Sequence, residues 1–310
     1  MSQTLAKESA TQNISLWRNM TADIREREYS PSSCIGGNYQ PYMDAYRAHS
    51  VQARSSTESR GAKWHELRYG DQAAQRLDLC VPDLSSLDGK PLPALLVFIH
   101  GGYWQALSAA DSLFAASGCI EHGHAFAAID YTLAPAATLP QIVEECRSAL
   151  TCLARHAAAF GFDAKRIVVA GSSAGAHLAA MLAWSCWRVS QPQIAVRAAV
   201  LVSGIYELEP LVGTSINTAL GMDLETARAQ SPALLPLAGF PQTLVVWGDI
   251  ETQEFKRQSQ HFSRDLNRAS ARAETMELPE RNHFDVILDL AKPGTPLGDR
   301  TLSLLEAAAR

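Results

Sequence analysis

The stretch GSSAGAH, residues 171–177, lies between the apolar run RIVVA (166–170) and the segment LAAMLAW (178–184). The first run has the composition of a buried strand and the second that of a helix. Between them, Gly171, Ser173 and Gly175 fit the pattern G-x-S-x-G. A tight strand-to-helix turn of this kind holds a serine hydroxyl exposed, as a nucleophile requires. On its own, the pattern fits a phosphate loop or a plain tight turn equally well.

Strand-like and helix-like segments alternate on both sides of this turn. Such alternation predicts an α/β fold, a mostly parallel twisted sheet with helices on both faces. WHELRY (64–69) and QRLDLCV (75–81) alternate as half-exposed strands do and are joined at Gly70–Asp71, so they predict an antiparallel hairpin at the sheet edge. The remaining predicted strands are 94–99, 125–131, 166–171, 197–204, 243–248 and 271–278, and helices are predicted to begin near residues 108, 139, 174 and 254.

Two regions fall outside this alternation. Residues 1–60 are polar and mixed, with helix-like stretches at 14–28 and 43–54 and the turn-forming SPSSCIGGNYQPY (30–42) between them. They predict an N-terminal extension that packs as a cap on a main domain of residues 61–310. Residues 205–240 have a broken pattern with three prolines, which predicts a small cap excursion over the strand ends.

Composition restricts the classes of protein to consider. With 310 residues and 47% hydrophobic content the chain can bury a large core, and its net charge of −5 with scattered basic residues argues against nucleic-acid or anionic-membrane binding. The six cysteines form no C-x-x-C pair and are expected to be reduced core residues. The first residues lack a basic segment followed by an apolar run, and no apolar stretch reaches membrane-spanning length, so we expect a cytoplasmic protein.

Three further segments carry chemistry at the ends of predicted strands. In HGGYW (100–104) consecutive glycines let backbone N–H groups face an oxyanion, so Gly102 and Tyr103, with Gly101, are candidate donors, and the Ala174 N–H at the helix start is another. Asp249 and Glu251 both follow the strand 243–248 and qualify as the carboxylate that orients a base. His283 follows the last predicted strand and is the candidate base. Nucleophile, acid and base thus occur in the order Ser, Asp/Glu, His.

Over roughly residues 60–300 the sequence resembles the α/β-hydrolase superfamily, and within it the kynurenine formamidase (arylformamidase) and esterase branch. The resemblance is carried by HGGYW, DYTLAP (130–135), GSSAGAHLAA, SGIYELEPL (203–211) and NHFDV (282–286). Where that branch commonly reads D-S-P-E-F, this chain has E-T-Q-E-F, so the resemblance puts Glu251, rather than Asp249, in the place of the acid. Thr132 stands where an arginine is common.

The resemblance implies a cofactor-independent serine hydrolase that cleaves a small acyl ester or amide, with an aryl formamide as one substrate class, through an acyl-enzyme on Ser173. Glu251 and His283 would complete the triad. A carboxylesterase or carbamate hydrolase acting on aryl esters is the alternative within this class. A ligand-binding protein that keeps the fold without catalysis is the alternative from another class.

The expected ligand is a small, aromatic acyl substrate, with neither nucleic acid nor membrane as a partner, and a homodimer is left open. Tyr103, Trp104, Tyr131 and Tyr206 come from segments that converge on the expected binding edge, so they are the candidate substrate-binding residues. Tyr39 and Tyr42 of the extension are placed to reach over the site. His122 and His124 flank Gly123 in what we interpret as a helix-end turn, and no metal is predicted.

Overall fold

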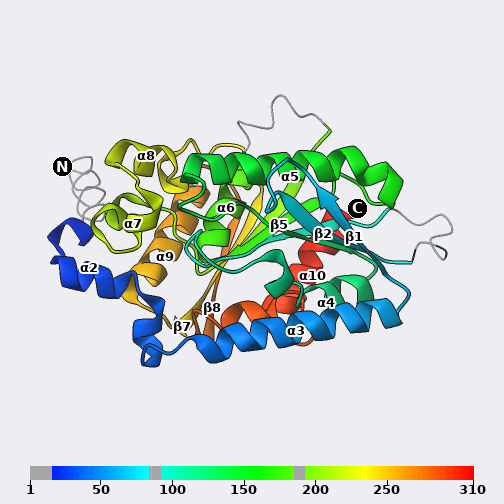
Figure 1. Cartoon of the computed structure of the whole chain (residues 1–310), viewed down its shortest axis with the longest axis horizontal. Coiled ribbons are helices and arrows are strands. Elements are labelled where there is room, and N and C mark those ends of the chain that lie inside the picture. The colour runs from blue at the N-terminus through cyan, green and yellow to red at the C-terminus, as the bar shows by residue number, and fades with distance from the viewer. Residues whose placement is uncertain (1–15, 84, 86–91, 185–192) are drawn as a thin grey trace.

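The computed structural model describes residues 16–83, 85, 92–184 and 193–310. Its eight strands form one sheet in the order β1-β2-β4-β3-β5-β6-β7-β8 (Figure 1). β1 pairs antiparallel with β2, as does β2 with β4, and all other neighbours are parallel. The predicted parallel sheet with an antiparallel hairpin at its edge is confirmed. The strands are β1 (Lys63–Arg68), β2 (Arg76–Val81), β3 (Leu95–Ile99), β4 (Ala125–Ile129), β5 (Ile167–Ser172), β6 (Val196–Val202), β7 (Gln242–Ile250) and β8 (Ala273–Asn282).

Helices cover both faces of the sheet, and each face has its own apolar core. Along β3, Leu95, Val97 and Ile99 face the core under α5, α6 and α9, while Leu96 and Phe98 face the core under α3, α4 and α10. Figure 1 shows α5 along one side of the sheet and α3 along the other. The α-helices are α2 (Ala22–Glu28), α3 (Gln40–Ser59), α4 (Ala116–Glu121), α5 (Leu139–Phe160), α6 (Ala174–Ala183), α7 (Asn217–Leu220), α8 (Leu224–Ala229), α9 (Gln253–Arg268) and α10 (Pro296–Ala308).

Local sequence explains where several helices begin and end. Thr138 and Gln141 form a reciprocal capping box at the start of α5, and Gly161 in the left-handed region (φ 73°) ends it. The single helix predicted from about residue 108 is instead a 3-10 turn and the short α4. The reason is local: the Ala109 N–H bonds to the carboxylate of Asp130, and the Ser112 hydroxyl bonds back to Ser108. The 3-10 helices are η1 (Leu16–Asn19), η2 (Pro31–Ile35), η4 (Ala109–Asp111), η6 (Glu209–Gly213), η7 (Pro232–Leu234) and η8 (Val286–Asp289).

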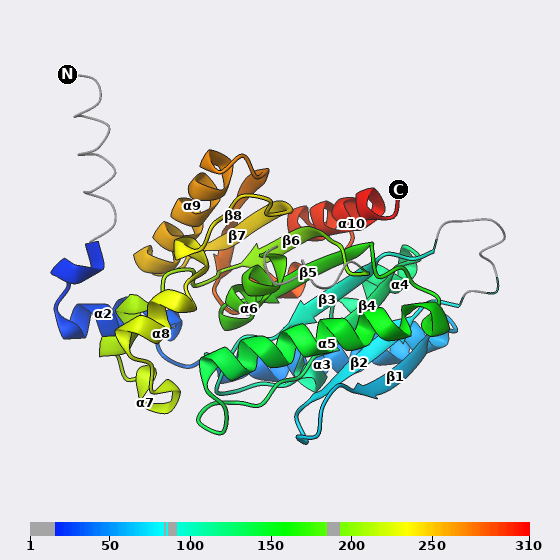
Figure 2. The same cartoon turned by 90° about the horizontal axis from the view of Figure 1, so that it is seen from above.

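The segment before β1 lies against the sheet domain. The helix predicted over 14–28 is divided into η1 and α2, because Thr21 caps α2 by accepting the Ile24 N–H; Ile14 lies outside the described residues. The stretch predicted as helical over 43–54 lies within α3. Figures 1 and 2 both show α2 beside α7 and α8 of the 205–240 excursion, at one end of the molecule.

Two further sequence expectations concern cysteines and membranes. Cys80, Cys119, Cys146 and Cys152 are buried free thiols, whereas Cys34, expected in the core, is exposed because η2 lies on the surface. Cys186 is outside the described residues. Among the described helices, none is long and apolar enough to cross a membrane.

Candidate active site

Ser173 occupies a sharp turn between β5 and α6. Its backbone lies at φ 57° and ψ −121°, a strained conformation for a residue with a side chain. The flanking glycines have no room for one, since a Cβ at Gly171 would lie 2.1 Å from the carbonyl oxygen of Gly175 and a Cβ at Gly175 2.0 Å from that of Ile99. The G-x-S-x-G spacing is therefore explained by the close approach of β5, α6 and β3 around the serine.

His283 and Glu251 are in direct contact. The imidazole Nδ1 lies 3.1 Å from Oε2 of Glu251, and both side chains are buried. A carboxylate only accepts hydrogen bonds, so Nδ1 carries the proton and Nε2 is left free to act as a base. Oε1 of Glu251 accepts from the Ser203 hydroxyl (2.6 Å) and the Gly248 N–H (2.7 Å). Three donors thus fix one buried carboxylate.

Asp249, the other acid considered, points elsewhere. β7 continues past Gly248 to Ile250, with an irregular register against β8, and this extra length carries Asp249 into solvent before the chain turns back at Glu251. Among the described residues, the Glu251 carboxylate is the one in contact with His283. The alternative assignment of the acid to Asp249 is wrong by this geometry.

The loop after β3 carries the other candidate N–H donors. Gly102 (φ 87°) and Tyr103 (φ 52°) are consecutive left-handed residues, an arrangement that turns successive amides toward one concave side. A Cβ at Gly102 would lie 2.4 Å from the Ala106 carbonyl oxygen, so the turn excludes a side chain there. Within the described chain, the N–H groups of Gly101, Gly102, Tyr103 and Ala174 have no acceptor. They are free to bind a ligand oxygen.

His100, at the start of this loop, holds it through buried contacts. Its ring stacks on Tyr131 (4.3 Å between centroids), its Nδ1 lies 3.0 Å from the Gly101 carbonyl oxygen, and its Nε2 lies 3.5 Å from the Asp130 carboxylate. Burial tends to raise the pKa of Asp130, but hydrogen bonding and charge from His100, with the Ala109 N–H, lower it below its usual value. His100 therefore braces the loop.

Ser173 and His283 line one cavity of about 280 Å³, together with Gly101, Gly102 and Tyr103. Its wall is mostly apolar and comes from three parts of the chain. The extension, the ends of the strands and the excursion supply it through Tyr39, Met43, Tyr46, Phe98, Leu107, Phe114, Ile216, Phe284 and Ile287. Such a lining suits an aromatic or aliphatic group of small size.

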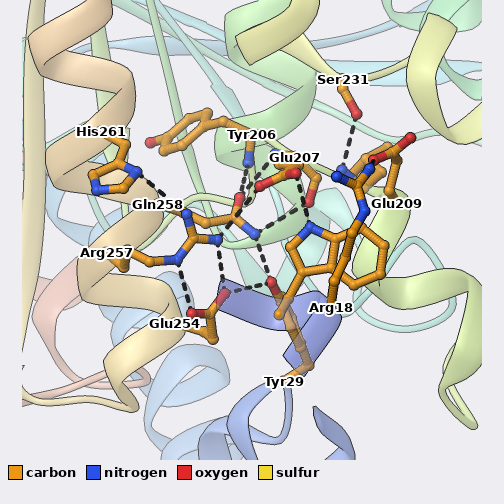
Figure 3. A network of polar contacts seen from close by, with 12 residues as sticks. Arg18, Tyr29, Tyr206, Glu207, Glu209, Ser231, Glu254, Arg257, Gln258 and His261 are labelled. Carbon is orange, nitrogen blue, oxygen red and sulfur yellow. Dashed lines mark hydrogen bonds and ion pairs between the residues drawn. The ribbon is translucent and has the colours of Figure 1, made fainter. Parts of the chain in front are cut away.

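A polar network fixes the extension against the sheet domain beside this cavity (Figure 3). The buried Tyr29 hydroxyl donates to Glu254 (2.8 Å) and accepts from Gln258 (2.9 Å), and Arg257 donates twice to Glu254 at 2.8 Å. The hydroxyl of Tyr103 in turn donates to the Tyr29 carbonyl oxygen. Burial, with the charge of Glu254, raises the pKa of Tyr29 well above its usual value, so it remains a donor.

Comparison with known proteins shows the family of this chain. The BD-FAE family model matches residues 77–266. Kynurenine formamidase of Danio rerio is 31% identical over 289 residues, which cover 89% of this chain and 94% of that protein. The chain belongs to the BD-FAE family of α/β-hydrolases. The Mycobacterium tuberculosis esterase LipC is 29% identical over 248 residues, covering 73% of this chain and 60% of that one. A solved structure from Silicibacter sp. tm1040, provisionally described as a thioesterase, superimposes with a TM-score of 0.72 at 29% identity over 87% of this chain and 94% of its own.

Of the four aromatic residues predicted to bind substrate in this α/β-hydrolase, only Tyr103 lines the cavity. The prediction is wrong for Trp104, Tyr131 and Tyr206, which are at most 1% exposed. Trp104 has φ 60° and turns inward onto His177, Tyr131 lies under His100, and Tyr206 stacks on Phe262 at 4.2 Å.

The extension contributes one cavity residue that the sequence placed over the site, Tyr39, and others that it did not identify, Glu26 among them. Tyr39 lines the cavity and stacks on Phe284, whereas Tyr42 supports that ring from outside the lining. Glu26 of α2 also lines the cavity. Its one local signal is its place in a helix that precedes the sheet domain, which does not reveal where the side chain lies.

His122 and His124, which flank Gly123, lie at the C-terminal end of α4. His122 caps the helix and its Nδ1 lies 2.9 Å from the Gly118 carbonyl oxygen, and burial lowers the pKa of His124. In the part of the chain that the structure describes, no group of three or more metal-binding side chains gathers.

Proposed function

We propose that this ester or amide hydrolase is a serine hydrolase that works through an acyl-enzyme, with Ser173 as nucleophile, His283 as general base and acid, and Glu251 as the orienting carboxylate. The contact between Glu251 and His283, together with a strained Ser173 that lines the same cavity as His283, is the observation that carries the proposal.

The reaction follows from where the protons lie. His283 Nε2 takes the Ser173 proton as Oγ attacks the substrate carbonyl, and the imidazolium so formed is stabilised by Glu251. The tetrahedral oxyanion accepts hydrogen bonds from the N–H groups of Gly102, Tyr103 and Ala174. His283 then returns the proton to the leaving group. Water, deprotonated by His283, attacks the acyl-enzyme, and the proton passes back to Ser173. Side chains and amides of this chain supply every step.

An aryl formamide is the proposed substrate class, with aryl esters and carbamates as the alternative. Relatives named kynurenine formamidase support the first and relatives named esterase the second. The aromatic wall of the cavity suits an aryl leaving group, and its small volume suits a short acyl group.

The domain division and the cellular setting belong to the same proposal. Residues 16–60 and the 205–240 excursion would act together as the cap, since both contribute to the cavity wall. The free thiols of Cys80, Cys119, Cys146 and Cys152 support a reducing compartment, and we propose the cytoplasm.

Labelling and turnover test this function separately. A fluorophosphonate should label the parent protein and Ser172→Ala but not Ser173→Ala. Undiminished labelling of Ser173→Ala, or none of the parent, contradicts the assignment of the nucleophile. Comparing the turnover of an N-formyl aniline with that of an aryl acetate of similar size then distinguishes a formamidase from an esterase. The formamide assignment fails if only the ester is hydrolysed.

A further inference from the structure

The cavity contains one carboxylate outside the proposed triad. Glu26 lies on α2 and is partly buried, and among the described lining side chains it is the only Asp, Glu, Lys or Arg. The remaining ionisable lining side chains are the two histidines, His100 and His283, and the tyrosines. The lining is otherwise apolar or carries neutral hydroxyl and backbone groups. A single formal negative charge thus faces a space that suits a small organic molecule.

The carboxylate of Glu26 is held by the excursion. Oε2 accepts the Ser215 N–H at 2.9 Å, and Oε1 accepts the Ser215 hydroxyl. A carboxylate offers about four lone-pair positions, so these bonds orient Glu26 and leave acceptor capacity over. Ser215 itself lines the cavity, which keeps the remaining capacity at the cavity wall.

No basic side chain of the described chain forms an ion pair with Glu26. The nearest arginines in sequence are engaged elsewhere: Arg27 lies 3.5 Å from Glu28, and the guanidinium of Arg25 lies over the Trp17 ring at 5.8 Å. The charge is therefore uncompensated within this part of the protein. A partly buried carboxylate without a cation is stabilised when a ligand brings one.

The charge of Glu26 also reaches the loop that carries the candidate oxyanion donors. Burial and the charge of Glu26 together raise the pKa of the Tyr103 phenol well above its usual value. Glu26 and Tyr103 thus interact in the cavity that Ser173 and His283 also line. A substrate bound at Ser173 has this carboxylate as its charged neighbour in the cavity.

We propose that Glu26 is a specificity-determining residue that selects acyl substrates with a positively charged amine away from the scissile carbonyl. This rests on the proposed function, because it assigns the substrate class of that same cavity. Glu26 discriminates in both directions: it accepts hydrogen bonds from an ammonium group and repels a carboxylate, for which the described lining offers no Lys or Arg.

Three phenyl acetates that share one frame test the proposal. The para substituent is aminomethyl in the first, methyl in the second and carboxymethyl in the third. For the parent protein we expect kcat/KM to fall from the cationic to the neutral ester by about tenfold to a hundredfold, the usual strength of a charge-assisted hydrogen bond, and to fall further for the anionic ester. Equal kcat/KM for the three esters would overturn the proposal.

Two variants assign the preference to Glu26. Glu26→Gln should remove the advantage of the cationic ester, measured as the ratio of its kcat/KM to that of the neutral ester, while Asp23→Asn, an exposed change in the same helix, should keep the ratio of the parent. If Glu26→Gln keeps the full preference for the cationic ester, another group recognises the ammonium and the proposal is wrong. Glu26→Asp should restore part of the preference, which separates loss of charge from disturbance of α2.

Direct binding separates failure of this proposal from failure of the proposed function. Benzylamine, benzyl alcohol and phenylacetate are titrated calorimetrically into the parent and into Ser173→Ala. Tighter binding of benzylamine that is lost in Glu26→Gln supports the role of Glu26 even where no ester is hydrolysed. Equal affinity for benzylamine and benzyl alcohol contradicts it even where all three esters are turned over.

Discussion

At the scale of single residues, the two acids at the end of β7 provide a test and its control. Glu251 contacts His283 and Asp249 lies in solvent two residues earlier. Glu251→Gln should lower kcat by about four orders of magnitude, because an amide in place of the carboxylate favours the wrong imidazole tautomer. Asp249→Asn should leave kcat within about twofold. Steady-state rates on an aryl acetate check this, and a larger loss in Asp249→Asn than in Glu251→Gln would reverse the assignment.

His177 provides a residue-scale prediction about pH. Burial lowers its pKa to about 4 from 6.5, and a bond from its ring to the Gln230 carbonyl oxygen (2.7 Å) only partly offsets this. The folded protein therefore keeps His177 neutral while the unfolded chain takes up a proton below pH 6.5. The contribution of neutral His177 to the free energy of unfolding is complete above pH 6.5. It is lost as the pH falls toward 4, by about 3 kcal/mol in total.

Replacing this histidine should flatten that dependence. His177→Gln should make the free energy of unfolding less sensitive to pH between 6.5 and 4, as measured by urea titration at several pH values. His49→Gln, at an exposed position, serves as the control and should keep the slope of the parent. An unchanged slope in His177→Gln would assign the acid sensitivity to other groups.

At the scale of elements, the attachment of α2 depends on Tyr29. Its hydroxyl joins Glu254 and Gln258 of α9, and its carbonyl oxygen accepts from Tyr103. Tyr29→Phe should lower the free energy of unfolding by about 1–2 kcal/mol, since it leaves two buried polar groups short of a partner. Tyr39→Phe, at a half-exposed ring, should change it by less than about 0.5 kcal/mol. Thermal unfolding of both variants checks this prediction. If Tyr29→Phe is as stable as Tyr39→Phe, water replaces the lost hydrogen bonds and the prediction is wrong.

The sequence predicted elements better than it predicted which side chains line the cavity. Positions after strands are set by local pattern, so Ser173 and His283 could be chosen from glycines, apolar runs and chain order, whereas the preference for Glu251 over Asp249 came from the family resemblance. Tyr103 and Trp104 are neighbours with similar composition around them, yet the first lines the cavity and the second is buried in the core. That choice depends on contacts with His177 and Tyr29, which lie far away in the sequence.

At the scale of the whole molecule, the parallel sheet explains why distant residues meet. The loops after β3, β5, β7 and β8 all leave the same edge, and the irregular end of β7 determines which of its two acids turns inward. The wall opposite this edge comes from the extension and the excursion. Apart from Tyr39, their cavity side chains were not predicted, because neither region has a periodic pattern that fixes its position against the sheet.

The cavity wall that α2 and α3 supply has a consequence for how such a protein diverges. The proposed reacting groups lie at strand ends that the core holds in place, while Glu26, Tyr39, Met43 and Tyr46 of the cavity wall precede the first strand. Substitutions in α2 and α3 can therefore change which molecules the cavity accepts without disturbing the groups that cleave the bond. Related proteins that keep these strand ends can differ in the molecules they accept through residues of this segment.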